Sequence, residues 1–296
     1  MLESQLCSGR ALHTAWAAGV PCHYIVASDI RTVPRPAIAA LRMTSCLGVH
    51  RSTDDRHPAI IRSVSWSGNS IRSLFLNGPT GRLEALLNAG AENATHAALV
   101  CHPHPLFGGT LHNKVVSHTM KALNSFGFPV LRFNFRGTGL SQGEHDRGIG
   151  EVEDVRTALD WLDAEYHLPL VFAGFSFGSA VGLRAACADR RIRAVIGVGT
   201  PVVPIAEASE EPRVYSLDFL QDCIMPKLFV SGARDQFGPR AKLEALVASV
   251  PEPKKLVIIE GGDHFFEGRL RELRETIEAW VKEAVSLSPH LDRPLP

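Results

Sequence analysis

One stretch of the sequence decides the fold: Leu170-Val171-Phe172-Ala173-Gly174-Phe175-Ser176-Phe177-Gly178. Its first four residues are apolar and predict a buried strand, and the small-residue segment 177–188 predicts a helix. Between them stands the pattern G-x-S-x-G, with Ser176 at a sharp strand-to-helix turn. The flanking glycines let neighbouring backbone pass close by, and the helix directs its positive dipole end at the serine. This context predicts that Ser176 is a nucleophile; the alternative is a glycine-rich turn with an incidental serine.

A serine hydroxyl needs a general base, because it is a poor nucleophile at neutral pH. Asp235 and His264 each follow a later apolar segment that predicts a strand. The order serine, acid, histidine is the one expected for a nucleophile on this kind of turn. We therefore predict that Ser176, Asp235 and His264 are the catalytic residues. Asp263 is the competing acid, but its position next to His264 makes contact with the imidazole Nδ1 difficult.

The negative charge that develops on a carbonyl oxygen during such a reaction needs two N–H donors. The residue after the nucleophile, Phe177, is expected to supply one of them. The other is expected from the loop after the apolar segment 97–101, which reads H-P-H-P-L-F-G-G. Prolines have no N–H, so the candidates for this oxyanion hole are His104 and Leu106, and the sequence leaves both open.

Two other patterns suggest different sites. His102 and His104 are spaced as H-x-H, which suggests a metal, but the alternate prolines and the lack of a nearby carboxylate argue against one. The glycine-rich loop 137–143 superficially resembles a dinucleotide-binding loop. The residues after it do not continue as a helix, so a pyrophosphate would lack the helix N-terminus that binds it. We expect no metal and no cofactor, and we interpret Arg136 as a structural donor to neighbouring carbonyl groups.

Strands and helices alternate along the chain, which predicts an α/β fold with a mostly parallel central sheet covered on both faces. The predicted strands are 73–77, 83–88, 97–101, 130–135, 170–175, 194–199, 227–231 and 255–259. The predicted helices are 114–125, 150–166, 177–188, 240–250 and 265–285. The three predicted catalytic residues all follow strands, at the edge where an open α/β sheet binds its ligands.

The composition excludes several classes of function. The chain has 296 residues, 45% of them hydrophobic, and its 31 basic and 31 acidic residues balance. A neutral chain argues against nucleic-acid binding by bulk charge and against attraction to anionic membranes. The six cysteines include no C-x-x-C pair, and no run of about 18 apolar residues predicts a transmembrane helix. We expect a cytoplasmic protein with no nucleic-acid or membrane partner; its oligomeric state stays open.

Residues 1–60 differ from the rest of the chain, with frequent prolines, clusters of polar residues and no sustained periodicity. We predict an irregular, mostly disordered N-terminal extension over 1–60 and one catalytic domain over 61–290. The extension makes a poor signal peptide, because proline and histidines interrupt its apolar part. A sharper hypothesis is that the natural chain starts at Met43 and that residues 1–42 are a gene-model artefact.

These motifs together resemble the α/β-hydrolase superfamily, and more narrowly its small bacterial dienelactone-hydrolase-like branch of serine hydrolases. The resemblance covers about residues 70–285 and rests on the blocks 101–110 with 113–116, 133–141, 174–178 and 262–266. It implies a three-layer α/β/α hydrolase fold, with Ser176, Asp235 and His264 as the catalytic triad. Dienelactone hydrolases use a cysteine nucleophile, so the serine in this chain argues against their substrate.

Between residues 199 and 225, where α/β hydrolases often carry a lid, the chain has room for a loop and one short helix. Residues 200–204 and 215–220 are expected either to line the mouth of the site or to be a plain connector. A minimal lid favours an open site and a small soluble substrate. The predicted function is hydrolysis of an ester or thioester through an acyl-enzyme. The alternatives are a small peptidase or amidase with the same triad, and a non-catalytic binding protein that retains the fold.

Overall fold

The computed structural model describes residues 70–205 and 214–286. The predictions for residues 1–60, including a start at Met43, lie outside the described residues, and the domain boundaries stay a prediction. The strands are β1 (Ile71–Gly78), β2 (Gly81–Asn88), β3 (Ala97–Cys101), β4 (Val130–Phe133), β5 (Leu170–Phe175), β6 (Ile192–Val198), β7 (Lys227–Gly232) and β8 (Lys254–Ile259). The helices are α1 (Lys114–Asn124), α2 (Gly150–Tyr166), α3 (Phe177–Ala186), α4 (Arg240–Ser249) and α5 (Leu270–Ser286), with the 3-10 helices η1 (Pro105–Phe107) and η2 (Asp218–Asp222).

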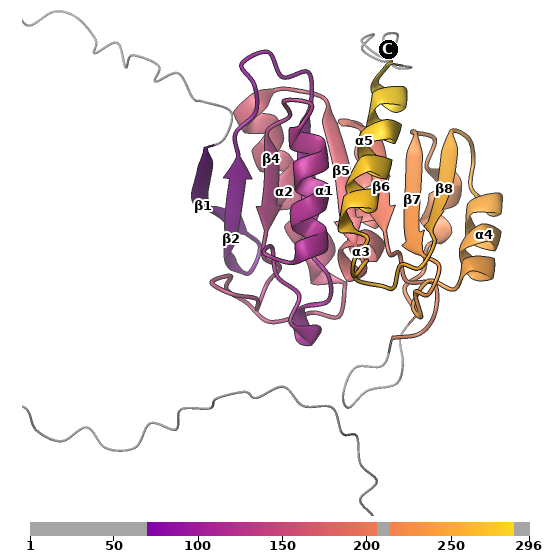
Figure 1. Ribbon diagram of the computed structural model, residues 1–296. Coiled ribbons are helices and arrows are strands. Elements are labelled where there is room, and N and C mark those ends of the chain that lie inside the picture. Colours follow the sequence, from indigo (N-terminus) through magenta and orange to yellow (C-terminus); the bar gives the residue numbers. More distant parts are fainter. Residues whose placement is uncertain (1–69, 206–213, 287–296) are drawn as a thin grey trace, which may run out of the picture. The chain divides into compact units, whose positions relative to one another are not determined.

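In the described part of the chain, one eight-stranded sheet has the order β1-β2-β4-β3-β5-β6-β7-β8. Strands β4, β3, β5, β6, β7 and β8 pair in parallel, whereas the β1–β2 hairpin and the β2–β4 pair are antiparallel. Figure 1 shows the arrows of β5, β6 and β7 pointing the same way. The predicted mostly parallel sheet is therefore confirmed, and the carboxyl ends of its parallel strands meet at one edge.

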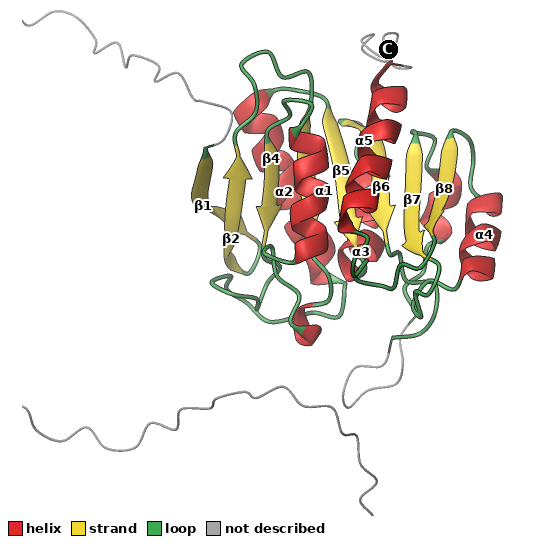
Figure 2. Ribbon diagram, in the orientation of Figure 1, coloured by secondary structure: helices red, strands yellow, loops and turns green. Residues whose placement is uncertain are grey.

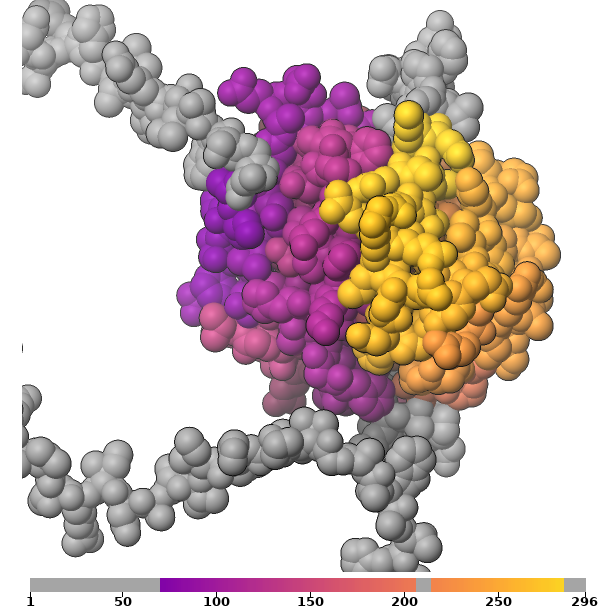
Figure 3. Space-filling view, in the orientation of Figure 1, coloured from indigo at the N-terminus to yellow at the C-terminus, as the bar shows by residue number. Residues whose placement is uncertain are grey.

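Helices cover both faces of the sheet and make three layers (Figure 2). The side chains of α2 and α3 join one buried cluster, and those of α1 and α5 join the other. Helices α1 and α5 also pack against each other, which Figure 3 shows as neighbouring magenta and yellow surfaces. None of the described helices is long and apolar enough to cross a membrane.

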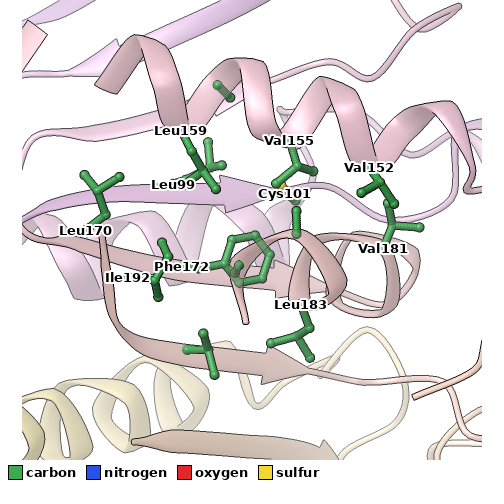
Figure 4. Close-up of a cluster of buried hydrophobic side chains, with 14 of the residues drawn as sticks. Leu99, Cys101, Val152, Val155, Leu159, Leu170, Phe172, Val181, Leu183 and Ile192 are labelled. Atoms are coloured by element: carbon green, nitrogen blue, oxygen red, sulfur yellow. The ribbon is translucent and has the colours of Figure 1, made fainter. Parts of the chain in front are cut away.

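The central strands are buried on both faces, which explains their continuous apolar runs. Successive side chains alternate between the two clusters: Leu99 and Phe172 contribute to the cluster under α2 and α3, and Val100 and Ala173 to the cluster under α1 and α5. Figure 4 shows the first cluster, in which Val155 of α2 lies over these strands. The sheet is therefore a rigid support for the loops at its carboxyl edge.

The prediction that the last helix begins at Phe265 is wrong, because α5 begins at Leu270. Phe266 and Gly268 have φ angles of 54° and 68°, in the left-handed region that a right-handed helix excludes. The residues between 265 and 270 instead form turns after the candidate histidine. In the segment between β6 and β7, the described residues contain one short helix, η2, as predicted.

Candidate active site

Ser176 stands on the turn between β5 and α3, with φ 55° and ψ −119°. This conformation is strained for a residue with a side chain, and the surrounding backbone holds it in place. A Cβ on Gly174 would lie 2.3 Å from the carbonyl oxygen of Gly178, so the two ends of the turn are in contact. The glycines of the G-x-S-x-G pattern are therefore required by close packing, as the sequence predicts.

The structure brings the three predicted catalytic side chains into one hydrogen-bonded chain. His264 Nε2 lies 2.9 Å from Ser176 Oγ, and His264 Nδ1 lies 2.9 Å from Asp235 Oδ2. An ionised carboxylate only accepts, so Nδ1 carries the proton and Nε2 is left to accept from the serine hydroxyl. Each of the three side chains follows a different strand, β5, β7 or β8, and all three are buried.

Asp235, rather than Asp263, is the carboxylate that contacts the histidine. Asp263 Oδ1 instead accepts a hydrogen bond of 2.9 Å from the backbone N–H of Glu267. Burial alone would raise the pKa of Asp235, but the hydrogen bond from His264 and those from Phe237 N–H and the Ser231 hydroxyl hold that pKa below its usual value. The carboxylate is therefore ionised at neutral pH and favours a cationic imidazole beside it.

Aromatic rings surround the imidazole of His264. The ring centroids of Phe175, Phe237 and Phe265 lie 5.0, 4.7 and 5.3 Å from that of His264. These rings limit the access of water to the hydrogen bonds and fix the orientation of the imidazole. Phe237 was not predicted from the sequence, although its place two residues after Asp235 was an available signal.

The loop 102–109, called the oxyanion loop here because the second oxyanion donor is predicted in it, lies directly against the turn that carries Ser176. The parallel pairing of β3 with β5 sets Cys101 opposite Gly174, so His104 and Phe177 each lie three residues beyond a paired position. The rings of His104 and Phe177 are in contact, with centroids 4.9 Å apart. The N–H of Leu106 donates to His104 Nδ1 at 3.3 Å. Leu106 is therefore already engaged inside the loop, which favours the N–H of His104 as the second oxyanion donor.

His102 fastens the oxyanion loop to the end of β4. Its Nδ1 donates to Pro103 O at 2.6 Å, and its Nε2 accepts from Phe135 N–H at 3.0 Å. Complete burial lowers the pKa of His102 to about 4, so the ring is neutral. With both nitrogens bonded to backbone, His102 is unsuited to ligate a metal in this conformation. No group of three metal-ligating side chains occurs in residues 70–205 and 214–286.

Two carboxylates on α2 contact and stabilise the loop that follows β4, and neither was predicted from the sequence. Asp154 accepts from Arg136 Nε at 3.0 Å and from its Nη2 at 2.7 Å, and Glu151 pairs with His145 at 2.7 Å. Arg136 was predicted to donate to neighbouring carbonyl groups, and it does donate to the carbonyl oxygen of Gly150. Its main partner, however, is the carboxylate of Asp154. The sequence does contain a signal for them: Glu151 and Asp154 are acidic residues in the first turns of a helix face that is otherwise apolar.

Comparison with known proteins gives consistent matches. A family model described as an alpha/beta hydrolase domain matches residues 97–290. An uncharacterized protein of Rickettsia prowazekii is 34% identical over 218 residues, which are 70% of this chain and 87% of that protein. The solved structure of an alpha-beta serine hydrolase homologue from Coxiella burnetii is 35% identical and covers 73% of this chain and 100% of its own, with a TM-score of 0.64. An a/b serine hydrolase without lid from Xanthomonas campestris is 29% identical over 74% of this chain and 96% of its own, with a TM-score of 0.62.

Proposed function

This chain belongs to the alpha/beta hydrolase family, and from that premise we propose that it cleaves an ester or thioester of a small substrate through a serine nucleophile. The observation that carries the proposal is the continuous hydrogen-bonded chain from Ser176 through His264 to Asp235. Such a chain activates a hydroxyl that is otherwise a poor nucleophile. No metal or organic cofactor takes part in the proposed reaction.

In the first half of the proposed reaction, Ser176 Oγ attacks the carbonyl carbon of the substrate while its proton passes to His264 Nε2. Asp235 stabilises the imidazolium that results, through the hydrogen bond to Nδ1. The carbonyl oxygen becomes an anion and accepts hydrogen bonds from the N–H groups of Phe177 and His104. His264 then gives its proton to the leaving alcohol or thiol, and the acyl group stays on Ser176.

In the second half, a water molecule takes the place of the leaving group. His264 accepts a proton from that water, which attacks the acyl-enzyme, and the same two N–H groups stabilise the oxyanion again. Collapse of the intermediate returns the proton to Ser176 Oγ and releases a carboxylic acid. The aromatic rings around His264 support both steps, because they keep the hydrogen bonds out of bulk water.

Labelling with a fluorophosphonate tests the nucleophile directly. We expect covalent modification of the full chain at Ser176, located by peptide mass spectrometry, and its loss in Ser176→Ala. The matched control is Ser249→Ala, which changes an exposed serine at the end of α4. A correctly folded wild-type protein that stays unlabelled would overturn the proposal and favour a binding protein that retains the fold.

The kind of bond is tested separately, with acyl esters of graded chain length, matched thioesters and aminoacyl amides. We expect kcat/KM for the best ester or thioester to exceed that for the matched amide at least a hundredfold. Equal or faster turnover of amides would contradict the proposed bond and identify an amidase or peptidase. Because Ser176 labelling is independent of the substrate, the two experiments separate a wrong substrate class from a wrong nucleophile.

A further inference from the structure

Two cysteines that are distant in the sequence meet at the C-terminal end of α3, the end opposite Ser176. Cys187 directly follows α3, and Cys223 directly follows η2, in the segment between β6 and β7. The Cys187 thiol donates a hydrogen bond to Cys223 Sγ, and the two sulfur atoms lie 2.6 Å apart. Both thiols are free, so the two side chains need to move little to form a covalent bond.

A buried positive charge lies beside this cysteine pair. Lys227, at the start of β7, is completely buried, and its ammonium group donates to the carbonyl oxygens of Pro251 and Pro253 at 2.8 and 3.3 Å. Carbonyl oxygens carry no net charge, so the ammonium group still favours a negative charge close to it, and its electrostatic field acts on both cysteines. A cation beside a thiol favours the thiolate, which is the reactive form of cysteine.

The two thiols of the pair differ in acidity. The hydrogen bond from the Cys187 thiol lowers the pKa of Cys223, and the charge of Lys227 acts in the same direction, against the effect of burial. The contact with Cys223 raises the pKa of Cys187, and burial raises it further. Cys223 is therefore the cysteine that ionises first, and Cys187 is the protonated thiol next to it.

The burial of the pair determines which oxidants can reach it. Cys223 is completely buried, whereas Cys187 is half-buried. A small hydroperoxide fits beside Cys187, but a bulky disulfide reaches Cys223 Sγ only when surrounding side chains are displaced. We propose that Cys187 and Cys223 are an oxidation site, at which a small hydroperoxide forms a disulfide that fastens the segment between β6 and β7 to α3.

The proposed reaction has two steps. In the first, the Cys223 thiolate attacks one oxygen of hydrogen peroxide: an S–O bond forms, the O–O bond breaks, and the released hydroxide takes up the proton that Cys223 lost, which gives water. In the second, Cys187 Sγ attacks the sulfur of the Cys223 sulfenic acid. An S–S bond replaces the S–O bond, and the Cys187 proton leaves with the hydroxyl group as a second water. The two thiols lose two electrons, and one peroxide is reduced to two waters.

The disulfide adds a covalent link to a row of weaker contacts between α3 and residues 215–223. The ring of Tyr215 packs edge-on against Phe177, with centroids 5.6 Å apart, and Arg184 Nη2 donates to the carbonyl oxygen of Ser216 at 3.3 Å. The link joins positions that are 36 residues apart, which restricts the unfolded chain and therefore stabilises the fold.

This oxidation site is separate from the proposed hydrolysis. Cys187 is eleven positions after Ser176, a rise of about 16 Å along an α-helix. Ser176→Ala is therefore expected to form the disulfide as the wild type does.

Peptide mass spectrometry of the full chain after treatment with hydrogen peroxide tests this proposal. The chain is first reduced with dithiothreitol and desalted, then oxidised at neutral pH, alkylated with iodoacetamide and digested without reductant. Trypsin places the two cysteines on separate peptides, 185–190 and 214–227. We expect a disulfide to join these two peptides and dithiothreitol to separate them. Glutathione disulfide is expected to form the link at least about tenfold more slowly than hydrogen peroxide does, because it is bulky.

Two further cysteine variants test the roles within the pair. In Cys187→Ala, the sulfenic acid at Cys223 has no neighbouring thiol, so we expect dimedone to label Cys223 at least about fivefold more than in the wild type. The control is Cys101 of β3, which is completely buried and whose thiol has a pKa raised by burial. It is expected to stay free in the oxidised protein, and Cys101→Ala is expected to form the disulfide as the wild type does.

Thermal melting measures the effect on the fold. The oxidised wild type is expected to melt at least about 5 °C above the reduced wild type. The same treatment is expected to leave the Tm of Cys187→Ala unchanged, and a cooperative transition of this variant shows that it is folded.

Three results would contradict the proposal. A folded wild-type chain that keeps both thiols free after peroxide treatment, or that joins either of them to another cysteine or to a second chain, would overturn the oxidation site. Stronger dimedone labelling of Cys187 in Cys223→Ala than of Cys223 in Cys187→Ala would reverse the order of the two steps. A disulfide that leaves the Tm unchanged would overturn its role in fastening the segment.

Discussion

The carbonyl oxygen of His102 lies so close to Gly178 that a Cβ on residue 178 would be 2.4 Å from it. The oxyanion loop and the helix that follows the nucleophile are therefore held at a distance that only glycine permits. The proposed oxyanion donors are the N–H groups of His104 and Phe177. His102 lies two residues before the first donor and Gly178 directly follows the second, so this contact sets the distance between the donors. The smallest side chain at residue 178 must push the two donors apart.

Gly178→Ala is expected to lower kcat by about a hundredfold or more, because the loss of one oxyanion donor has that effect in enzymes that use such a hole. The change is measured with the best ester substrate, next to fluorophosphonate labelling, which reports whether Ser176 still reacts. Gly268→Ala is the control: it adds the same methyl group at a positive φ where no atom lies within 4 Å. Equal losses in the two variants would show that the contact with His102 does not set the effect, since the methyl group added at residue 268 meets no atom within 4 Å.

Asp235→Asn is expected to reduce kcat by about 10³–10⁴-fold, because an asparagine favours the wrong tautomer of His264 and leaves the imidazolium unstabilised. Asp263→Asn is expected to change kcat at most severalfold, since its carboxylate accepts from the N–H of Glu267 and not from the imidazole. Both are measured as kcat and KM on the same ester. A larger loss in Asp263→Asn than in Asp235→Asn would reverse the assignment of the acid.

The strands of the sheet and the turn that carries the nucleophile could be predicted from the sequence, because both depend on local patterns. The apolar run 170–175 and the helix 150–166 coincide with β5 and α2 at both ends. The triad candidates were found because each follows a short apolar run, although β8 itself begins with two lysines and only Ile259 in it is buried. Their mutual distances were not available from the sequence, since these depend on how β5, β7 and β8 align at the carboxyl edge.

Contacts between segments that are distant in the chain explain what the sequence analysis missed. The partner of Arg136 is Asp154, 18 residues away, and no local pattern pairs them. The choice between His104 and Leu106 required the hydrogen bond from Leu106 N–H to the imidazole of His104. The late start of α5 depends on positive φ at Phe266, a conformation that is uncommon for a residue with a side chain.

His102 is expected to make the protein sensitive to acid. Its pKa falls from 6.5 to about 4 on burial, so below pH 6.5 the unfolded chain binds a proton that the folded chain excludes. Stability is therefore lost as the pH falls from 6.5 towards 4, by about 2–3 kcal/mol at pH 4.5. We expect the loss of unfolding free energy between pH 7 and 4.5 to be smaller by this amount in His102→Gln, measured by urea denaturation. His112→Gln, at an exposed position, is the control, and an equally steep loss in His102→Gln would contradict a neutral, buried His102.

The buried ion pair between Arg136 and Asp154 is expected to stabilise the fold far more than an exposed pair does. The Asp154 side chain is completely buried and that of Arg136 is 6% exposed, so Asp154→Asn leaves a guanidinium with little access to water and without its main partner. We expect a loss of about 3 kcal/mol in unfolding free energy, measured by the urea midpoint at unchanged m-value. Glu165→Gln removes the exposed partner of Arg72 and should lose less than about 1 kcal/mol. Equal losses in the two variants would contradict the prediction that the buried pair stabilises the fold more than the exposed pair does.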